Sequence, residues 1–171
     1  AIRARTPNYW EFGVLSGVTE TPASAEPDRM AHAFSFDPAY LANLAKVDPA
    51  ALQDLQVIVL HKWDTTREWV RELSAAEGRI VTQGAKMKSW NPMGKDSLFY
   101  VENCMAALDS PGEWFLDRKK SELLYVPRAG EKPETTFAAA PALKRIAFVH
   151  DAKDVTFDGI TFAHNAWTLP S

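Results

Sequence analysis

Short apolar runs separated by polar turns fill the middle of the chain and predict β-strands. Leu55–His61 is dense in β-branched residues and is too short for a helix. The further predicted strands are Glu68–Leu73, Arg79–Gln83, Leu98–Val101, Glu113–Asp117 and Glu122–Val126. Six or more short strands joined by polar turns favour a mainly β fold, a β-sandwich rather than a helical bundle.

Cap and turn signals lie between these strands. Asp37-Pro38 and Asp48-Pro49 each place Asp at a helix cap and Pro at the first helical position, and so predict two short helices. Gly78 offers the left-handed residue of a hairpin formed by the second and third predicted strands. A further turn of helix is predicted over Glu102–Leu108.

Both ends of the chain differ from this centre. Residues 1–36 contain three prolines and several small residues, which predict irregular chain with one short strand. Residues 37–142 are expected to form the sandwich with its short helices. Residues 143–171 contain three very short strands joined by Asp and Gly turns, which resemble one coil of a right-handed parallel β-helix. These strands are predicted at Ile146–Val149, Val155–Phe157 and Ile160–Phe162.

A single coil of this kind does not bury its own inward face, because solenoid repeats need about three or more stacked neighbours. We therefore expect residues 143–171 to belong to a longer protein or to an unusual assembly. Phe157 and Phe162 are expected to make an uncovered edge adhesive.

Composition and charge argue against several classes of protein. With 46% hydrophobic and 24% charged residues, the chain is neither disordered nor collagen-like. A net charge of -3 does not suit a phosphate backbone, so nucleic acid is not an expected partner. No apolar run approaches the roughly 18 residues that a membrane helix needs, so no membrane partner is expected.

The sequence contains no motif for binding a metal or a cofactor. The single cysteine, Cys104, excludes an internal disulfide and a multi-cysteine zinc site, and its apolar neighbours indicate packing. The histidines lack the spacing that places two ligands on one face, and the glycines form no phosphate loop. The sequence therefore predicts neither a metal nor a cofactor.

One block of residues resembles a known family. Phe99–Asn103, Ala107–Arg118 and Leu124–Pro127 are similar to a segment of bacterial right-handed parallel β-helix proteins, with a pectin lyase-like fold. These proteins are related to the β-helix glycoside hydrolases, including those of β-xylosidase type. Arg3–Asn8 also looks like one of their strands. The resemblance implies a β-sandwich-like insertion domain, after which the chain returns to the β-helix.

The same resemblance implies a secreted or periplasmic location. It also implies carbohydrate and the remaining β-helix coils of a longer parent chain as partners. The catalytic carboxylates of such enzymes are expected on later coils, and no residue here matches them, so the chain's own activity stays open. One departure is the last predicted hairpin, whose turn usually contains Gly and here contains Lys120-Ser121.

Glu113 and Asp117 are the best candidate pair of carboxylates for glycoside hydrolysis. On a straight strand they lie about 13 Å apart at ~3.3 Å per residue. Hydrolysis needs separations of about 5–5.5 Å or roughly 6.5–9.5 Å. We therefore expect Glu113 to cap the turn near Pro111-Gly112 and Asp117 to shape the turn that follows it. No catalytic residue is predicted.

Tryptophans are the main candidates for binding sugar, because an aromatic face packs against the apolar C–H surface of a sugar ring. Trp63 and Trp90 lie at strand ends or in loops, where an exposed ring could bind a sugar. The alternative is that these rings are buried. His164 and Trp167 follow the predicted coil, near where a cleft would open. The two tryptophans expected in the core are Trp69 and Trp114.

Three functions are compatible with these features. The first is a non-catalytic insertion domain and returning coil that shape the carbohydrate cleft of a β-helix glycoside- or polysaccharide-processing protein. The second is an autonomous carbohydrate-binding module. The third is a structural or oligomerisation domain with no ligand. The second predicts exposed indoles on one face, whereas the third predicts these rings buried or in a protein interface.

Overall fold

The computed structural model describes residues 1–23 and 28–166. The chain forms two compact units, with the first ending at Gly130 and the second beginning at Glu131. The sequence predicted divisions after residues 36 and 142 instead. The first 36 residues belong to the first unit because their strands pair within its sheet.

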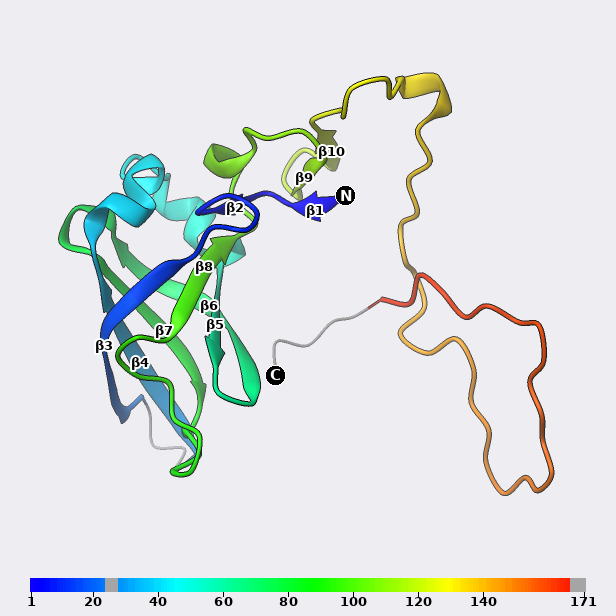
Figure 1. Ribbon diagram of the computed structural model, residues 1–171, viewed down its shortest axis with the longest axis horizontal. Coiled ribbons are helices and arrows are strands. Elements are labelled where there is room, and N and C mark those ends of the chain that lie inside the picture. The colour runs from blue at the N-terminus through cyan, green and yellow to red at the C-terminus, as the bar shows by residue number, and fades with distance from the viewer. Residues whose placement is uncertain (24–27, 167–171) are drawn as a thin grey trace. The chain divides into compact units, whose positions relative to one another are not determined.

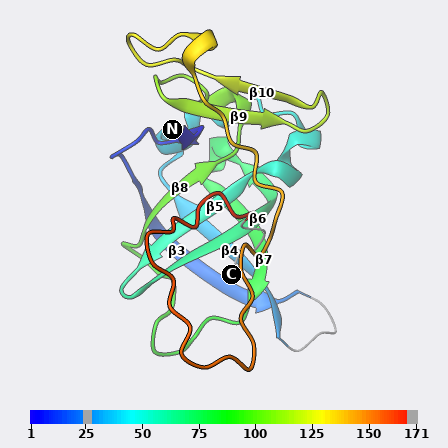
Figure 2. The ribbon, with the colours of Figure 1, turned by 90° about the vertical axis from the view of Figure 1, so that its right-hand side faces the viewer.

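Six antiparallel strands of the first unit close into a ring. They are β3 (Gly13–Pro22), β4 (Arg29–Phe36), β5 (Gln56–His61), β6 (Asp64–Ser74), β7 (Arg79–Ala85) and β8 (Leu98–Glu102). They pair in the order β3-β4-β7-β6-β5-β8, and β8 pairs again with β3 (Figure 1, Figure 2). The predicted mainly β fold is confirmed, and ring closure adds a barrel-like feature to the predicted sandwich.

A smaller three-stranded sheet joins the start of the chain to a later hairpin. β9 (Glu113–Asp117) and β10 (Glu122–Tyr125) form the hairpin, and β1 (Ile2–Arg3) pairs parallel with β9. The short β2 (Arg5–Thr6) follows β1 and pairs with β8. The described residues also form 3₁₀ helices η1 (Pro38–Leu44), η2 (Pro49–Asp54), η3 (Ala75–Glu77), η4 (Met105–Ala107) and η5 (Pro133–Thr135). None of the helices in this described part is long and apolar enough to cross a membrane.

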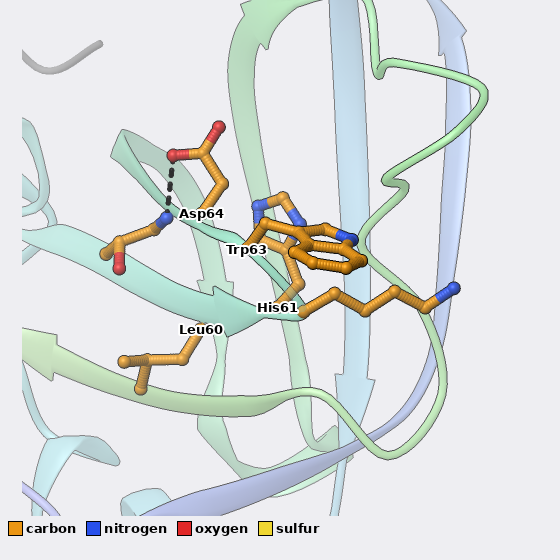
Figure 3. Close-up of a pocket in the computed structure, with 6 residues that line it drawn as sticks. Leu60, His61, Trp63 and Asp64 are labelled. Carbon is orange, nitrogen blue, oxygen red and sulfur yellow. Dashed lines mark hydrogen bonds between the residues drawn. The ribbon is translucent and has the colours of Figure 1, made fainter.

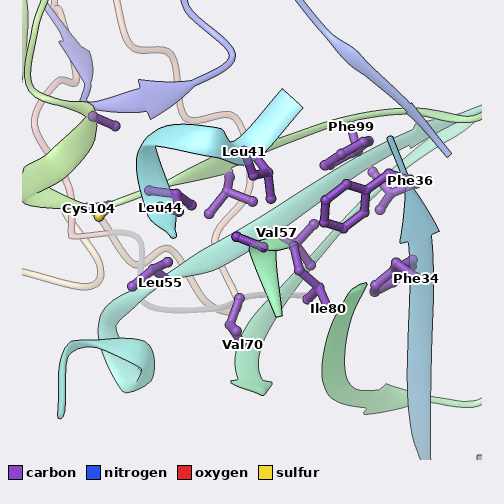
Figure 4. Close-up of a cluster of buried hydrophobic side chains, with 14 of the residues drawn as sticks. Phe34, Phe36, Leu41, Leu44, Leu55, Val57, Val70, Ile80, Phe99 and Cys104 are labelled. Carbon is purple, nitrogen blue, oxygen red and sulfur yellow. The ribbon is translucent and has the colours of Figure 1, made fainter. Parts of the chain in front are cut away.

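Alternate residues of the ring's strands fill its interior. Phe34 and Phe36 of β4 cluster with Phe99 of β8, Ile80 of β7 and Val57 of β5, and all five are buried (Figure 4). The centroids of the Phe36 and Phe99 rings lie 4.9 Å apart. Successive side chains of a strand point to opposite faces, so the alternation in sequence separates inside from outside.

The predicted caps and the first hairpin are confirmed. Asp37 and Asp48 each accept the backbone N–H two residues onward, at 2.9 and 2.8 Å, and begin η1 and η2. Gly78 has a φ of 63° between η3 and β7. A Cβ at Gly78 would lie 1.9 Å from the carbonyl oxygen of Phe36, so a side chain does not fit this turn.

Residues 1–36 contain far more strand than the sequence predicted. β3 and β4 are ten and eight residues long and pair along most of their length. Met30, His32, Phe34 and Phe36 alternate along β4 as its buried positions. Histidine in the middle of this apolar pattern interrupts the signal, because its burial depends on partners from distant strands.

The second unit follows an extended path, with η5 near its start. The three strands predicted there are not formed among its described residues, because no neighbouring strand lies beside them to exchange hydrogen bonds. They were expected at Ile146–Val149, Val155–Phe157 and Ile160–Phe162. The chain nevertheless returns on itself, since Ala166 donates its N–H to the carbonyl oxygen of Leu143 at 2.8 Å.

The β9–β10 hairpin turns through a left-handed serine. Ser121 has a φ of 57°, a region that glycine adopts freely and other residues disfavour. We expect Ser121→Gly to raise the free energy of unfolding by about 0.5–1 kcal/mol, measured by urea denaturation. Lys120→Gly is the control, because Lys120 does not have a positive φ, and it should give no gain. A Ser121→Gly chain less stable than the natural one would contradict this account.

Candidate functional site

The tip of the β5–β6 hairpin is an exposed aromatic corner. His61 at the end of β5 pairs with Asp64 at the start of β6, so Lys62 and Trp63 form a two-residue turn. Trp63 is 80% exposed. Residues 60–65 line an open depression at this tip, where Figure 3 shows Trp63 beside the end of the strand ribbon. The Trp63 ring is therefore accessible to a ligand.

A second exposed indole lies in a loop that contacts the same hairpin through a lysine. Trp90, in the loop between β7 and β8, is 62% exposed. Lys88 Nζ lies 5.3 Å from the centroid of the Trp90 ring and 3.3 Å from Asp64 Oδ2. One lysine thus connects the loop of Trp90 to the hairpin of Trp63. We call Trp63, Asp64, Lys88 and Trp90 the aromatic surface.

Polar groups flank the two indoles. Asp64 Oδ1 accepts the N–H of Thr65 at 2.8 Å (Figure 3). This hydrogen bond, and then the hydrogen bond from Lys88, lower the pKa of the Asp64 carboxyl, which is therefore ionised at neutral pH. His61 Nε2 lies 2.9 Å from Thr66 Oγ1, while His61 Nδ1 is buried without a hydrogen-bond partner among the described residues.

This arrangement suits binding of a sugar. Sugar rings have apolar C–H faces and a rim of hydroxyls, so they pack on indoles and hydrogen-bond to polar groups beside them. Asp64 is the one carboxylate among the described residues that line the depression. Glycoside hydrolysis commonly uses two carboxyl groups. The aromatic surface therefore offers contacts for a sugar, not a pair of catalytic acids.

Two of the four residues that the sequence suggested as carbohydrate contacts lie on segments that Lys88 links. Trp63 and Trp90 share the aromatic surface, and both are exposed. His164 lies in the second unit, where its ring centroid is 6.4 Å from that of Phe137. Trp167 lies outside the described residues.

Sequence reasoning misses Asp64 and Lys88 as members of this surface. Asp64 directly follows Trp63, and recognising a two-residue hairpin turn there would have indicated it. Lys88 lies in a loop without a strand pattern, 24 residues away from Asp64. Only the three-dimensional structure brings its ammonium group to the hairpin.

Trp69 and Trp114, expected in the core, are half-buried instead. Glu68 and Val70 are both buried, and alternation along β6 therefore places Trp69 on the outer face of the ring. The guanidinium of Arg3 lies 5.0 Å from the centroid of the Trp114 ring. Mid-strand position alone did not reveal which face each indole takes.

Glu113 and Asp117 have the structural roles that the sequence predicted. Glu113 is fully buried, and its Oε2 accepts two backbone N–H groups of the turn before it, both at 3.1 Å. Its Oε1 lies 3.4 Å from the backbone nitrogen of Arg5, which donates to it. Asp117 Oδ1 accepts the N–H groups of Lys119 and Lys120 at 3.0 and 3.1 Å. Both turn assignments are confirmed.

Metal-binding side chains do not gather in the part of the chain that the structure describes. It contains no group of three or more His, Cys, Asp or Glu residues able to hold a metal ion. Cys104 is buried, and burial raises the pKa of its thiol, which keeps it protonated. Its position in the main apolar cluster agrees with the packing role expected for it.

Comparison with known proteins finds a similarity to one insertion domain. Residues 72–128 match the GH141 insertion domain. The matched segment runs from the end of β6 to just past β10, so this part of the first unit is similar to that insertion domain. No curated protein matches the chain.

A solved structure named "Glycoside hydrolase" has a similar fold, with a TM-score of 0.55 and 20% sequence identity. The similarity covers 84% of this chain and 25% of that one. This chain therefore spans about a quarter of the length of the protein it matches.

Proposed function

We propose that this chain is a non-catalytic part of a glycoside- or polysaccharide-processing protein. In this proposal the first unit is an insertion domain that contacts carbohydrate through the aromatic surface. The observation that carries it is the contact of Lys88 with both Asp64 and Trp90, which links the loop of one exposed indole to the hairpin that carries the other, Trp63. The match to the GH141 insertion domain supports the same assignment.

The proposal gives the second unit a scaffold role, as one coil of a right-handed parallel β-helix in a longer parent protein. The bond from Ala166 to Leu143 closes a circuit of chain. Left-handed residues at Asp151, Asp154 and Gly159 allow sharp corners between straight stretches. The apolar side chains of this circuit are exposed, and stacked coils of the parent would cover them. A secreted or periplasmic bacterial location is part of this proposal.

An autonomous carbohydrate-binding module is the second candidate. The closed strand ring encloses its own apolar core within the first unit, which favours independent folding. Both candidates use the same aromatic surface, so one binding experiment addresses them together.

Binding of the 171-residue chain to a glycan array tests the proposal. We expect oligosaccharide binding that Trp63→Ala and Trp90→Ala each weaken about tenfold, because an aromatic anchor contributes on the order of 1–2 kcal/mol. Trp10→Ala is a matched control, since Trp10 is 76% exposed but lies in the loop before β3. It should bind as the natural chain does.

Thermal unfolding establishes that each variant is folded before its binding is compared. A folded natural chain that binds no glycan would overturn the proposed contact and favour a structural domain. Binding that survives both tryptophan substitutions would likewise exclude the aromatic surface as the site.

A further inference from the structure

The wall of the strand ring opens between β6 and β7. These two strands pair from Ser74 and Arg79 to Val70 and Thr82. Beyond that point β6 stays paired with β5 as far as Asp64, while β7 stays paired with β4. The two strands therefore separate, and the described residues of the ladder leave a gap between them.

A cavity of about 310 Å³ lies in this gap. β6 lines it with Arg67, Glu68 and Trp69, and β7 lines it with Gln83 and Gly84. Its charged lining is completed by Arg29, at the start of β4, and by Asp28, just before the strand. Its size is at the lower end of the range of roughly 300–1,000 Å³ typical of small-molecule sites.

A buried carboxylate forms part of this cavity. The Glu68 side chain is 5% exposed, and its Oε2 lies 2.8 Å from His32 Nδ1 and accepts a hydrogen bond from Thr82. A Cβ at Gly84 would lie 1.8 Å from Glu68 Oε1. The absence of a side chain at Gly84 therefore allows the carboxylate to occupy the gap, with its position fixed by His32 and Thr82.

The chemistry of the lining selects a neutral, polyhydroxylated ligand. The lining contains two arginines and two carboxylates, and two of these four groups are already in ion pairs, Arg67 with Glu102 and Glu68 with His32. The lining therefore has no excess charge to attract an anion or a cation. Gln83 adds an amide that both donates and accepts, and half-buried Trp69 adds an aromatic ring. Alternating donors and acceptors beside an aromatic ring are what one sugar ring requires.

We propose that the β6–β7 gap is a second carbohydrate subsite, which holds a single neutral sugar ring between Trp69 and the Glu68 side of the cavity. It is separate from the aromatic surface and deepens the proposed function, on which its choice of ligand class rests. Its residues come from the outer face of β6 and β7 and from the opening in the ring, not from the hairpin tip.

The test uses a chain that carries both Trp63→Ala and Trp90→Ala, so that the aromatic surface no longer contributes. Amide NMR titrations with methyl glycosides of xylose, arabinose, glucose and galactose should show binding of at least one neutral sugar. Glucuronate is the anionic comparison and should bind more weakly. This titration does not depend on whether the aromatic surface binds glycans on the array, because Trp63 and Trp90 are already replaced. The two proposals are therefore tested separately.

Variants of the lining then locate the binding. Adding Trp69→Ala should weaken the best sugar about tenfold. Gln83→Ala removes only an amide and should also weaken binding. This second variant provides the test if Trp69→Ala prevents folding. Val81→Ala, on the same strand and outside the lining, is the matched control and should leave the affinity unchanged. The proposal would be overturned if no neutral sugar binds or if glucuronate binds more tightly than the neutral sugars. It would also be overturned if the folded Trp69→Ala or Gln83→Ala chain binds the best sugar with unchanged affinity.

Discussion

Replacing His32 with alanine is expected to lower the free energy of unfolding by about 3–5 kcal/mol, the usual cost of breaking a buried ion pair. The His32 side chain is fully buried between two carboxylates. Its Nδ1 lies 2.8 Å from Glu68 Oε2, and its Nε2 lies 3.0 Å from Glu20 Oε2. Without the imidazolium, two carboxylates from different strands face one another without the cation that separates them.

The charge state of His32 makes this contribution depend on pH. Burial alone would lower the pKa of His32, but the hydrogen bonds and charges of Glu68 and then Glu20 outweigh burial and raise it above 6.5. A raised pKa means that the folded state binds the proton more tightly than the unfolded state. The resulting stability is complete below pH 6.5 and is lost as the pH rises through the pKa of the folded state.

Glu20 sets the acidic side of this window. Burial would raise its pKa, but the backbone N–H of Met87 and the neighbouring His32 lower it below 4.5. Stability from Glu20 is therefore present above pH 4.5 and is lost as the pH falls through its pKa in the folded state. The two groups together predict greatest stability between about pH 5 and 6.5.

Urea denaturation between pH 4 and 9 measures both effects. The natural chain should lose stability as the pH rises above 6.5, and His32→Ala should be less stable and lack most of that dependence. His150→Ala is a matched control, because His150 is an exposed histidine in the second unit. Equal pH dependence in the natural and His32→Ala chains would contradict the buried carboxylate–imidazolium–carboxylate arrangement.

Removing the Glu113 carboxylate is expected to cost about 3 kcal/mol, because buried backbone donors then lose a charged acceptor. Glu113 accepts N–H groups from the turn that precedes β9 and from Arg5. It thereby connects the N-terminal strands to the β9–β10 sheet. Glu113→Ala leaves these donors without that acceptor in a fully buried position.

Asp117→Ala is the matched control for Glu113→Ala. Asp117 lies on the same strand and also accepts backbone N–H groups, but its side chain is 23% exposed. Water can replace its lost hydrogen bonds, so the expected cost is about 1 kcal/mol or less. Urea denaturation compares the two, and a Glu113→Ala chain no less stable than the Asp117→Ala chain would contradict the structural role of Glu113.

Local signals in the sequence predict the local parts of this fold. Asp37 and Asp48 indicate their helices because cap and Pro act within one turn of chain, and Gly78 indicates its hairpin for the same reason. Pairing between distant segments is not encoded in this way. The contact of β5 with β8 that closes the ring depends on the whole arrangement of strands.

The candidate site likewise contains residues that the sequence indicates and contacts that it does not. Trp63 and Trp90 are recognisable as exposed-ring candidates because each lies outside the regular alternation of a strand. Their connection through Lys88 and Asp64 joins a loop to a hairpin and has no sequence pattern. The His32–Glu68 pair is likewise invisible in sequence, since burial of either residue alone would be unfavourable.

The most direct test of the proposed carbohydrate contact follows the indole N–H signals of the 171-residue chain by NMR. The chain is labelled with ¹⁵N-tryptophan and titrated with the best oligosaccharide from the array, and the signals are assigned by single substitutions. We expect the Trp63 and Trp90 signals to shift in a saturable way, while the Trp10 signal stays in place. Saturable binding that leaves both the Trp63 and Trp90 signals unmoved would contradict it.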